Sequence, residues 1–433
     1  MIVIVIINLV LLWVAVYKLN SKLLQGSTAL LYYTSTLVML TLVSFLYYLS
    51  LVFKLQFSLL IILISAINLS HLYFTASTFK SFYINLTKGK SNYDIVPFLV
   101  LFIIAFFFLF TGSKYGFFDG WALWNSHAKF LFHPDSWQNM FADTTYESSA
   151  DYPLMLPALI AFFWRMIGST TFMVPLLISF TALATIPLLL YHALKPALKN
   201  YYLPIFAIAL LLTDHVFMGF VSEQCADIPL SVFILMTFVL YNHLTKTKEQ
   251  ATTYLLGFIC ASCMWIKNEG LLFCAIFSAS FMIVNYKRPG VISRYIAGAL
   301  LPIIVTLSYK QLYAPDTAFF SSGNNTQAIL TKLQDSSRYM LIAEKYAAIL
   351  LERFWIALIV IVAVGAINRQ YFKSVYFITL LLMLGGYTFV YLISPYHLGW
   401  HIYTSFHRLM NQIYPSLIFT TLLFCGRKLN AIH

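Results

Sequence analysis

The sequence predicts an all-α polytopic membrane protein with about thirteen transmembrane helices. Two observations predict this class. The chain of 433 residues is 61% hydrophobic and only 10% charged, and its apolar runs are continuous rather than alternating. A soluble protein of this length cannot bury so much apolar surface, and lipid tolerates only helices or closed barrels. Continuous apolar runs favour helices.

The apolar runs define the expected spans in order. The first run is followed by Lys18 and Lys22 and has no basic residue before it, which argues against a cleaved signal peptide and places the N-terminus outside. The spans near 205, 258 and 360 are shorter than about 20 residues, so they must recruit flanking residues or tilt less. The expected spans are 2–17, 27–52, 56–78, 94–112, 171–193, 201–213, 226–243, 252–266, 270–286, 291–310, 354–368, 374–393 and 409–426.

The charges divide the loops between these spans into two groups. Sixteen of the 27 basic residues fall on one side of the membrane, with only Asp94 and Glu249 among the 15 acids. Positive loops stay cytoplasmic, so the acidic side is predicted to be extracytoplasmic, here called the outer side, and the C-terminus cytoplasmic. The sixteen are Lys18, Lys22, Lys80, Lys88, Lys90, Lys195, Lys199, Lys246, Lys248, Lys287, Arg288, Arg294, Arg369, Lys373, Arg427 and Lys428.

The net charge of +12 does not indicate nucleic-acid binding. The basic residues lie in short loops without a long basic run, so membrane topology and anionic lipid headgroups explain them better. The five cysteines lie in or beside apolar segments and are interpreted as small core residues.

The organisation predicted from these patterns has three parts. Residues 1–93 form an N-terminal three-span module, 94–426 form a membrane core, and 427–433 are a cytoplasmic tail. The core carries two long outer loops, 113–170 and 311–353. Within the first, 153–168 is apolar but short, and counting it as a span would invert the later charge pattern. We therefore expect a juxtamembrane helix along the outer interface, with Leu154, Leu156, Leu159 and Ile160 on its apolar face.

Polar residues that could carry chemistry gather on the acidic side. They fall in the segments 118–125, 151–157, 223–229 and 265–270, and a fifth segment, 397–412, runs into the last span. Ionisable residues at membrane depth are costly and usually mark function. Acids, a lysine, an arginine and aromatics on one side suit a phosphorylated lipid and a sugar, because Arg and Lys neutralise phosphate and an acid can deprotonate a hydroxyl or hold a cation.

Structural interpretations of the same residues remain open. Asp119 could cap a helix at the headgroup level. Glu223 and Asp227 are one helical turn apart and could pair with Lys267 to hold helices together. His397 and His401 have the i,i+4 spacing of metal ligands, but their loop contains no acid.

The order of these segments resembles the type C glycosyltransferase superfamily, near the bacterial family 39 and lipopolysaccharide-sugar-transferase-like branch. The resemblance rests on the runs FDGWALWNSHAKFLF, DYPLMLPAL, ADIPLSVF, KNEGLLF and WHIYTSFHRLMNQIYP and covers roughly residues 94–426. Two departures are the three spans before the core and the absence of a large soluble domain after it, so acceptor recognition would come from the loops.

The resemblance implies roles for individual residues. Asp119 matches the catalytic acid of the first outer loop, and Asp227 or Glu223 matches the acid of the second. Lys267 and Arg408 become candidates for the carrier phosphate. A divalent cation, Mg²⁺ or Mn²⁺, held by Asp119 and Asp227 is left open. The candidate substrate-binding residues are Trp121, Trp124, Asn125, Asp151, Tyr152, Glu269, His401 and Gln412.

The function expected is therefore transfer of a hexose or pentose from a polyprenyl-phosphate-linked donor to a glycan, lipid or protein acceptor. The expected place is the outer face of a bacterial inner (cell) membrane, in cell-envelope glycan or glycolipid modification, with membrane lipid but no nucleic acid as partner. A polysaccharide ligase or polymerase, a lipid or glycan transporter, and a noncatalytic scaffold are the alternatives.

Overall fold

The structure, a computed structural model, describes residues 2–69, 94–142, 149–198, 201–316 and 324–429, and over these residues it contains helices and no β-strand. Seven described helices are long and apolar enough to cross a membrane, or eight if the bent pair of α15 and α16 forms one span. The predicted all-helical class is thus confirmed for this part of the chain, and its helices are those of a multi-pass membrane protein.

The helices match the predicted spans in position. The 56–78 span is described as far as Leu69, as the helix Phe57–Leu69. The other helices that match spans are α1 (Ile2–Leu23), α2 (Thr28–Val52), α4 (Ile95–Thr111), α7 (Met173–Leu198), α8 (Tyr202–Leu212), α10 (Asp227–Thr247), α11 (Thr252–Ile266), α12 (Asn268–Val284), α13 (Pro289–Leu312), α16 (Trp355–Ile367), α17 (Val375–Ile393) and α18 (Leu398–Leu429). Thirteen spans remain a prediction, because five of the shorter helices would have to cross in addition to the eight.

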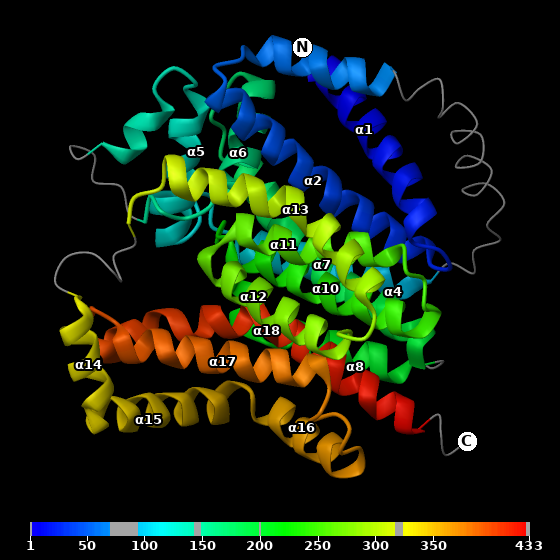
Figure 1. Ribbon diagram of the computed structural model, residues 1–433, viewed down its shortest axis with the longest axis vertical. Coiled ribbons are helices and arrows are strands. Elements are labelled where there is room, and N and C mark those ends of the chain that lie inside the picture. Colours follow the sequence, from blue (N-terminus) through cyan, green and yellow to red (C-terminus); the bar gives the residue numbers. More distant parts are fainter. Residues whose placement is uncertain (1, 70–93, 143–148, 199–200, 317–323, 430–433) are drawn as a thin grey trace.

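The remaining helices are short or lie in the predicted outer loops. They are η1, a π-helix (Gly120–Trp124), α5 (Asn125–Phe132), η2 (Trp137–Phe141), α6 (Met155–Ile167), α9 (His215–Gly219), α14 (Thr326–Gln334) and α15 (Ser336–Arg353). Helices α15 and α16 meet at a bend of 92°. In Figure 1, α5, α6 and α14 lie toward the same side of the molecule.

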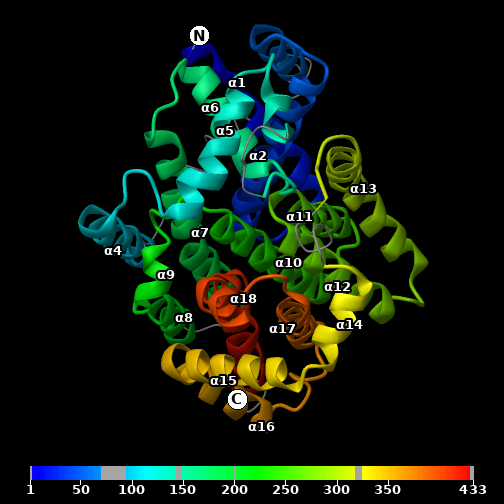
Figure 2. The ribbon, with the colours of Figure 1, turned by 90° about the vertical axis from the view of Figure 1, so that its left-hand side faces the viewer.

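The core is built around α10 and α18, whose apolar windows are 83% and 89% buried. Figure 1 shows these helices with α11, α12, α13 and α17 running in similar directions, and Figure 2 views α17 and α18 nearly end-on. Helices α11 and α13 approach closely at Gly257, where a Cβ would lie only 2.0 Å from the carbonyl oxygen of Tyr295. Small residues allow such close packing of helices in membranes.

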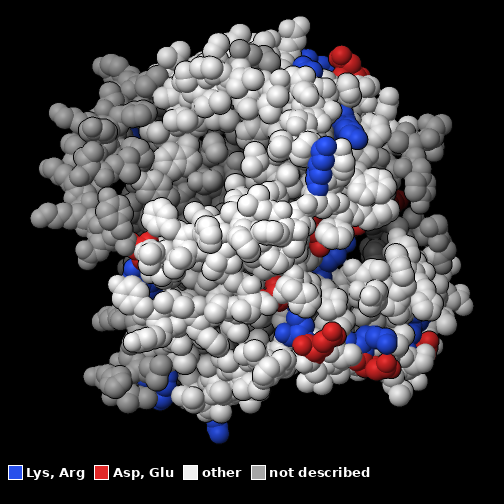
Figure 3. Space-filling model, turned by 180° about the vertical axis from the view of Figure 1, so that it is seen from behind, with Lys and Arg blue, Asp and Glu red and all other residues white. Residues whose placement is uncertain are grey.

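The polar contacts between loops respect the predicted division into two sides. Lys195 pairs with Asp94 at 2.5 Å, and Glu249 accepts a hydrogen bond from the backbone of Gln25 at 3.1 Å. All four residues belong to loops predicted to be cytoplasmic. On the face shown in Figure 3, charged side chains lie mostly toward opposite edges, with a broad uncharged surface between them. Lys80, Lys88, Lys90, Asp143, Glu147 and Lys199 lie outside the described residues.

The segment 153–168 contains α6, which ends at Gly168 in a left-handed conformation with φ of 81°. Its 13 residues span about 20 Å, less than the hydrocarbon core of a bilayer. The apolar face predicted for it is buried, but the burial continues around most of the helix because α2, α5 and α7 pack against it. Its place at the outer interface stays a prediction. The structure adds that α6 is covered by protein on most of its sides and not on one apolar face alone.

Candidate functional site

Five charged residues from distant parts of the chain form one cluster, here called the charged cluster. Asp119 precedes η1, Asp227 is the first residue of α10, Lys267 and Glu269 lie at the junction of α11 and α12, and Arg408 lies on α18. Each is joined to another by an ion pair of 3.0 Å or less. Four of the five predicted segments, 118–125, 223–229, 265–270 and 397–412, therefore meet.

Asp227 is the buried centre of the charged cluster, with 0% of its residue surface exposed. Its Oδ1 accepts hydrogen bonds from Lys267 Nζ at 2.8 Å and Gln412 Nε2 at 2.6 Å. Its Oδ2 accepts from Arg408 Nη2 at 3.0 Å and Nε at 3.3 Å. With both oxygens engaged and no solvent contact, Asp227 is placed to position its neighbours rather than to touch a substrate.

Asp119 is the accessible carboxylate of the charged cluster. Its Oδ2 lies 2.6 Å from Arg408 Nη2, and 31% of its side chain is exposed. Although it stands at the N-cap of η1, its side chain makes no capping hydrogen bond. The capping interpretation left open by the sequence is therefore wrong for the described geometry, and Arg408 bridges one partly exposed and one buried carboxylate.

Gly120 brings this loop close to the segment before α10. A Cβ at Gly120 would lie 2.4 Å from the backbone oxygen of Glu223, and one at Gly116, where φ is 79°, would lie 2.8 Å from the same atom. Only glycine admits this contact, because a side chain would displace the backbone beside Asp119. The close approach fixes where Asp119 stands relative to Arg408.

Lys267 is almost fully buried and faces two acids. Its Nζ lies 2.8 Å from Asp227 Oδ1 and 3.0 Å from Glu269 Oε1, and it stands 5.8 Å from the ring centre of Tyr152. Burial alone would lower the pKa of Lys267, but the two carboxylates outweigh burial and raise that pKa above its ordinary value. The lysine therefore stays charged and is surrounded by protein.

Glu223 lies beside the charged cluster without an ion pair to it in the described residues. Its carboxylate accepts a long contact of 3.8 Å from Cys225 Sγ. Burial and then the negative charge of Asp227 raise the pKa of Glu223 to about 7. Of the two acids that the sequence left as alternatives, Asp227 holds the network together, and Glu223 is an acid that can change its charge near neutral pH.

A second polar network adjoins the charged cluster through Asn268. Asn268 Nδ2 donates to Asp151 Oδ2 at 2.8 Å, and Lys310 Nζ donates to Asn268 Oδ1 at 2.8 Å. Lys310 Nζ also donates to the backbone oxygen of Asp151. Asp151 was among the residues predicted from the sequence, whereas Lys310 was not. A lysine at the outer end of the 291–310 span, against the positive-inside trend, was a usable signal for it.

The aromatic and amide candidates divide between the interior and the surface. Trp124 is fully buried, 5.5 Å from Tyr152 between ring centres, whereas Trp121 is exposed and packs on Phe118. Asn125 donates to Gln224 Oε1 at 2.8 Å. Trp121 is thus the aromatic candidate available to a ligand, whereas Trp124 is enclosed by protein.

His401 stands apart from the charged cluster. Its Nδ1 lies 2.8 Å from Ser394 Oγ, and its ring packs against Tyr391 and Tyr396. Gln412, by contrast, joins the charged cluster and is oriented by Tyr387, whose hydroxyl donates to Gln412 Oε1 at 2.9 Å. Among the described residues, no group of three or more His, Cys, Asp and Glu side chains is arranged to hold a metal ion.

The fold and the charged cluster define a class: a multi-helix membrane chain with a charge network that includes an exposed carboxylate. No family model, no curated protein and no solved structure matches the chain.

Proposed function

We propose that the protein is an integral-membrane glycosyltransferase of type C architecture that uses a polyprenyl-phosphate-linked sugar. The observation that carries the proposal is the bridge of Arg408 between buried Asp227 and partly exposed Asp119. Asp119 is accessible and could activate a hydroxyl. Arg408, which buried Asp227 holds in place, could bind a phosphate beside it.

In the proposed reaction, the acceptor hydroxyl oxygen attacks the anomeric carbon of the sugar. The new C–O bond forms as the bond between that carbon and the phosphate oxygen breaks, so the anomeric centre inverts. The hydroxyl proton passes to the Asp119 carboxylate, and the electron pair of the broken bond leaves with the lipid phosphate.

Arg408 would bind the donor phosphate directly, whereas Lys267 would hold Asp227 and Glu269 in place without touching the phosphate. The side chain of Arg408 is 24% exposed, whereas that of Lys267 is 4% exposed and already holds two carboxylates. A phosphate that engages Arg408 competes with Asp119 for the guanidinium, which would free Asp119 as a base when the donor is bound. This refines the expectation that both cations touch the phosphate.

The proposal includes the finer topology. Residues 94–426 would form the catalytic core after the three-span module 1–93, thirteen spans would cross the membrane, and the charged cluster would face the exterior of a bacterial cell membrane. Glycan, lipid and protein hydroxyls are all admissible acceptors, in keeping with a role in the cell envelope. Trp121 is the exposed ring beside Asp119 on which a sugar could stack.

The test is transfer by the purified full chain. Membranes or detergent micelles would carry radiolabelled polyprenyl-phosphate hexoses and pentoses, and transfer to extracted envelope glycans and lipids would be measured. We expect one donor class to be used and Asp119→Asn to abolish its use. The control Glu344→Gln should match the parent chain, because Glu344 is 69% exposed and, among the described residues, its ion-pair partner is the neighbouring Lys345.

Failure to transfer from every such donor would overturn the proposal. Transfer of a preassembled glycan that needs Arg408 and His401 but survives Asp119→Asn would replace it with the ligase or polymerase alternative. Movement of labelled lipid across the membrane without a new glycosidic bond would replace it with a transporter.

A further inference from the structure

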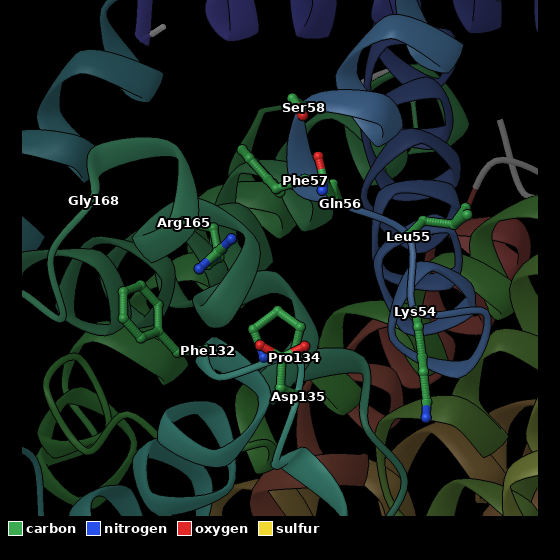
Figure 4. Close-up of a pocket in the computed structure, with 10 residues that line it drawn as sticks. All are labelled: Lys54, Leu55, Gln56, Phe57, Ser58, Phe132, Pro134, Asp135, Arg165 and Gly168. Carbon is green, nitrogen blue, oxygen red and sulfur yellow. The ribbon is translucent and has the colours of Figure 1, made fainter.

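A cavity of about 560 Å³ lies away from the charged cluster, between the end of α5, the C-terminal part of α6 and the connection from α2 to the Phe57–Leu69 helix. Figure 4 shows Arg165 in its wall beside Phe132 and Phe57, with Lys54 on the α2 side. Helix α6 separates the cavity from the segment of Asp151 by about 15 Å along its axis. The cavity is therefore a separate site at the predicted outer side.

Arg165 is a cation without a carboxylate partner in the described part of the chain. Its guanidinium carbon lies 5.8 Å from the ring centre of Phe57 and 5.7 Å from that of Phe132, and its buried Nε has no hydrogen-bond partner. Arg353 and Arg408, in contrast, each hold at least one carboxylate. Buried guanidinium donors usually find an acceptor, and a phosphate provides two in the matching geometry.

The other polar groups of the cavity leave an excess of positive charge. Lys54 and Arg165 contribute two cations and Asp135 one anion, and none of the three forms an ion pair among the described residues. The first residues of the Phe57–Leu69 helix, Phe57 and Ser58, also line the cavity. The free N–H groups at the start of a helix add to the attraction for an anion.

The Phe57–Leu69 helix connects the cavity to an apolar surface. Leu59, Ile62, Leu63 and Ile67 are each more than 40% exposed along it. The helix of 13 residues is about 20 Å long, which is comparable to the acyl region of one leaflet. A molecule with its phosphate at Arg165 could lay hydrocarbon chains along this helix, whereas a soluble phosphate ester would leave it uncovered.

We infer that this cavity binds the phosphate headgroup of an anionic membrane lipid, with Arg165 as its principal ligand and the acyl chains on the Phe57–Leu69 helix. Lys54, whose long side chain also lines the cavity, adds a second positive charge. Asp135 places one negative charge in the same cavity and would repel an anion close to it. The phosphate is therefore expected at Arg165. The inference does not depend on glycosyl transfer, because no residue of the charged cluster takes part.

The experiment compares lipids bound to the purified full chain by native mass spectrometry. Phosphatidylglycerol, diacylglycerol with the same acyl chains, and glycerol phosphate are titrated separately. We expect retention of phosphatidylglycerol only, and about a tenfold loss of that retention in Arg165→Gln, which removes a charge-assisted phosphate contact. Lys345→Gln, which removes an exposed cation elsewhere, serves as the matched control and should change nothing.

Two further arms keep the inference falsifiable. Arg165→Lys should bind more weakly than the parent chain but better than Arg165→Gln, and Ser58→Trp, which narrows the cavity and keeps Arg165, should also weaken binding. Equal binding of diacylglycerol would show that only the apolar helix matters and would overturn the inference. Binding of glycerol phosphate as tight as that of the lipid would assign the cavity to a soluble phosphate ester instead, and unchanged binding in a folded Arg165→Gln would also overturn it.

Discussion

Two arginines of this protein form ion pairs with buried aspartates, and they differ in what else they touch. Arg353 Nη2 lies 2.7 Å from Asp214 Oδ2, with side chains 5% and 8% exposed, and Nη2 also donates to Asn411. Arg408 pairs with buried Asp227 and with Asp119, which is 31% exposed. The first arrangement is closed, whereas the second presents an acid to the surroundings.

The difference separates a structural ion pair from a candidate site. Asp214 also caps α9 by accepting from the backbone of Val216 and Phe217, so Arg353 ties α9 to the bend between α15 and α16. A buried ion pair by itself is weak grounds for function, because its desolvation can cost as much as its attraction gains. An exposed acid on a fixed cation is a better indication, because exposure is what a substrate requires.

The largest expected effect is on transfer. Arg408→Ala should lower the rate constant for sugar transfer by about 10²–10⁴, because the phosphate contact and the placement of Asp119 are lost together. Arg353→Ala should leave the rate of the folded protein within about twofold, because Asp214, the carboxylate that pairs with Arg353, is buried. Equal losses, measured at a temperature where both variants are folded, would erase the distinction between the two arginines.

The next effect is on stability. Asp214→Asn and Asp227→Asn should each lower the free energy of unfolding by about 3–5 kcal/mol. The first leaves Arg353 without its carboxylate, and the second removes the buried carboxylate that Lys267 and Arg408 share. Asp119→Asn should cost at most about 1 kcal/mol, because its pair with Arg408 is partly solvated. Denaturant titration in one detergent would measure all three, and a loss in Asp119→Asn as large as in Asp214→Asn would make Asp119 structural.

A smaller effect should appear in the pH dependence. Because the pKa of Glu223 is raised from its ordinary value of 4.5 to about 7 in the folded chain, the folded state holds more protons than the unfolded state between these two pH values. Stability should therefore fall as pH rises through this window. Melting temperatures of the parent chain and Glu223→Gln should converge below this window and separate above it, with the variant the more stable; parallel curves would contradict the assignment.

The smallest expected change concerns Gly120. Gly120→Ala places a Cβ 2.4 Å from the Glu223 backbone oxygen, so the start of η1 must move and carry Asp119 with it. We expect transfer to slow by about tenfold, because small displacements of a catalytic group are costly, with little change in donor binding. Gly219→Ala, where nothing lies within 4 Å of the added atom, is the matched control; a rate as fast as the control's would show that the contact is not needed.

Much of the fold could be predicted because its determinants are local. Apolar runs of sufficient length mark the helices, and the distribution of lysines and arginines separates the two groups of loops, whose contacts in the structure stay within each group. The chain also marks α8, α11 and α16 as short, with 11, 15 and 13 residues. The placement of Asp119, Asp227 and Lys267 on one side followed from the same map.

The charge network itself required the tertiary structure. Arg408 and Asp227 are 181 residues apart, and no local pattern records that Arg408 also reaches Asp119. The same holds for Lys310, which joins Asn268 across 42 residues, and for the cavity at Arg165, whose walls come from three separated segments. The amino-acid sequence by itself determined that the chain is a helical membrane protein with polar residues gathered at one side, because hydrophobicity and charge act residue by residue. Helix packing alone decided which acid is buried, which is exposed and which cation bridges them, because burial and pairing depend on neighbours far away along the chain.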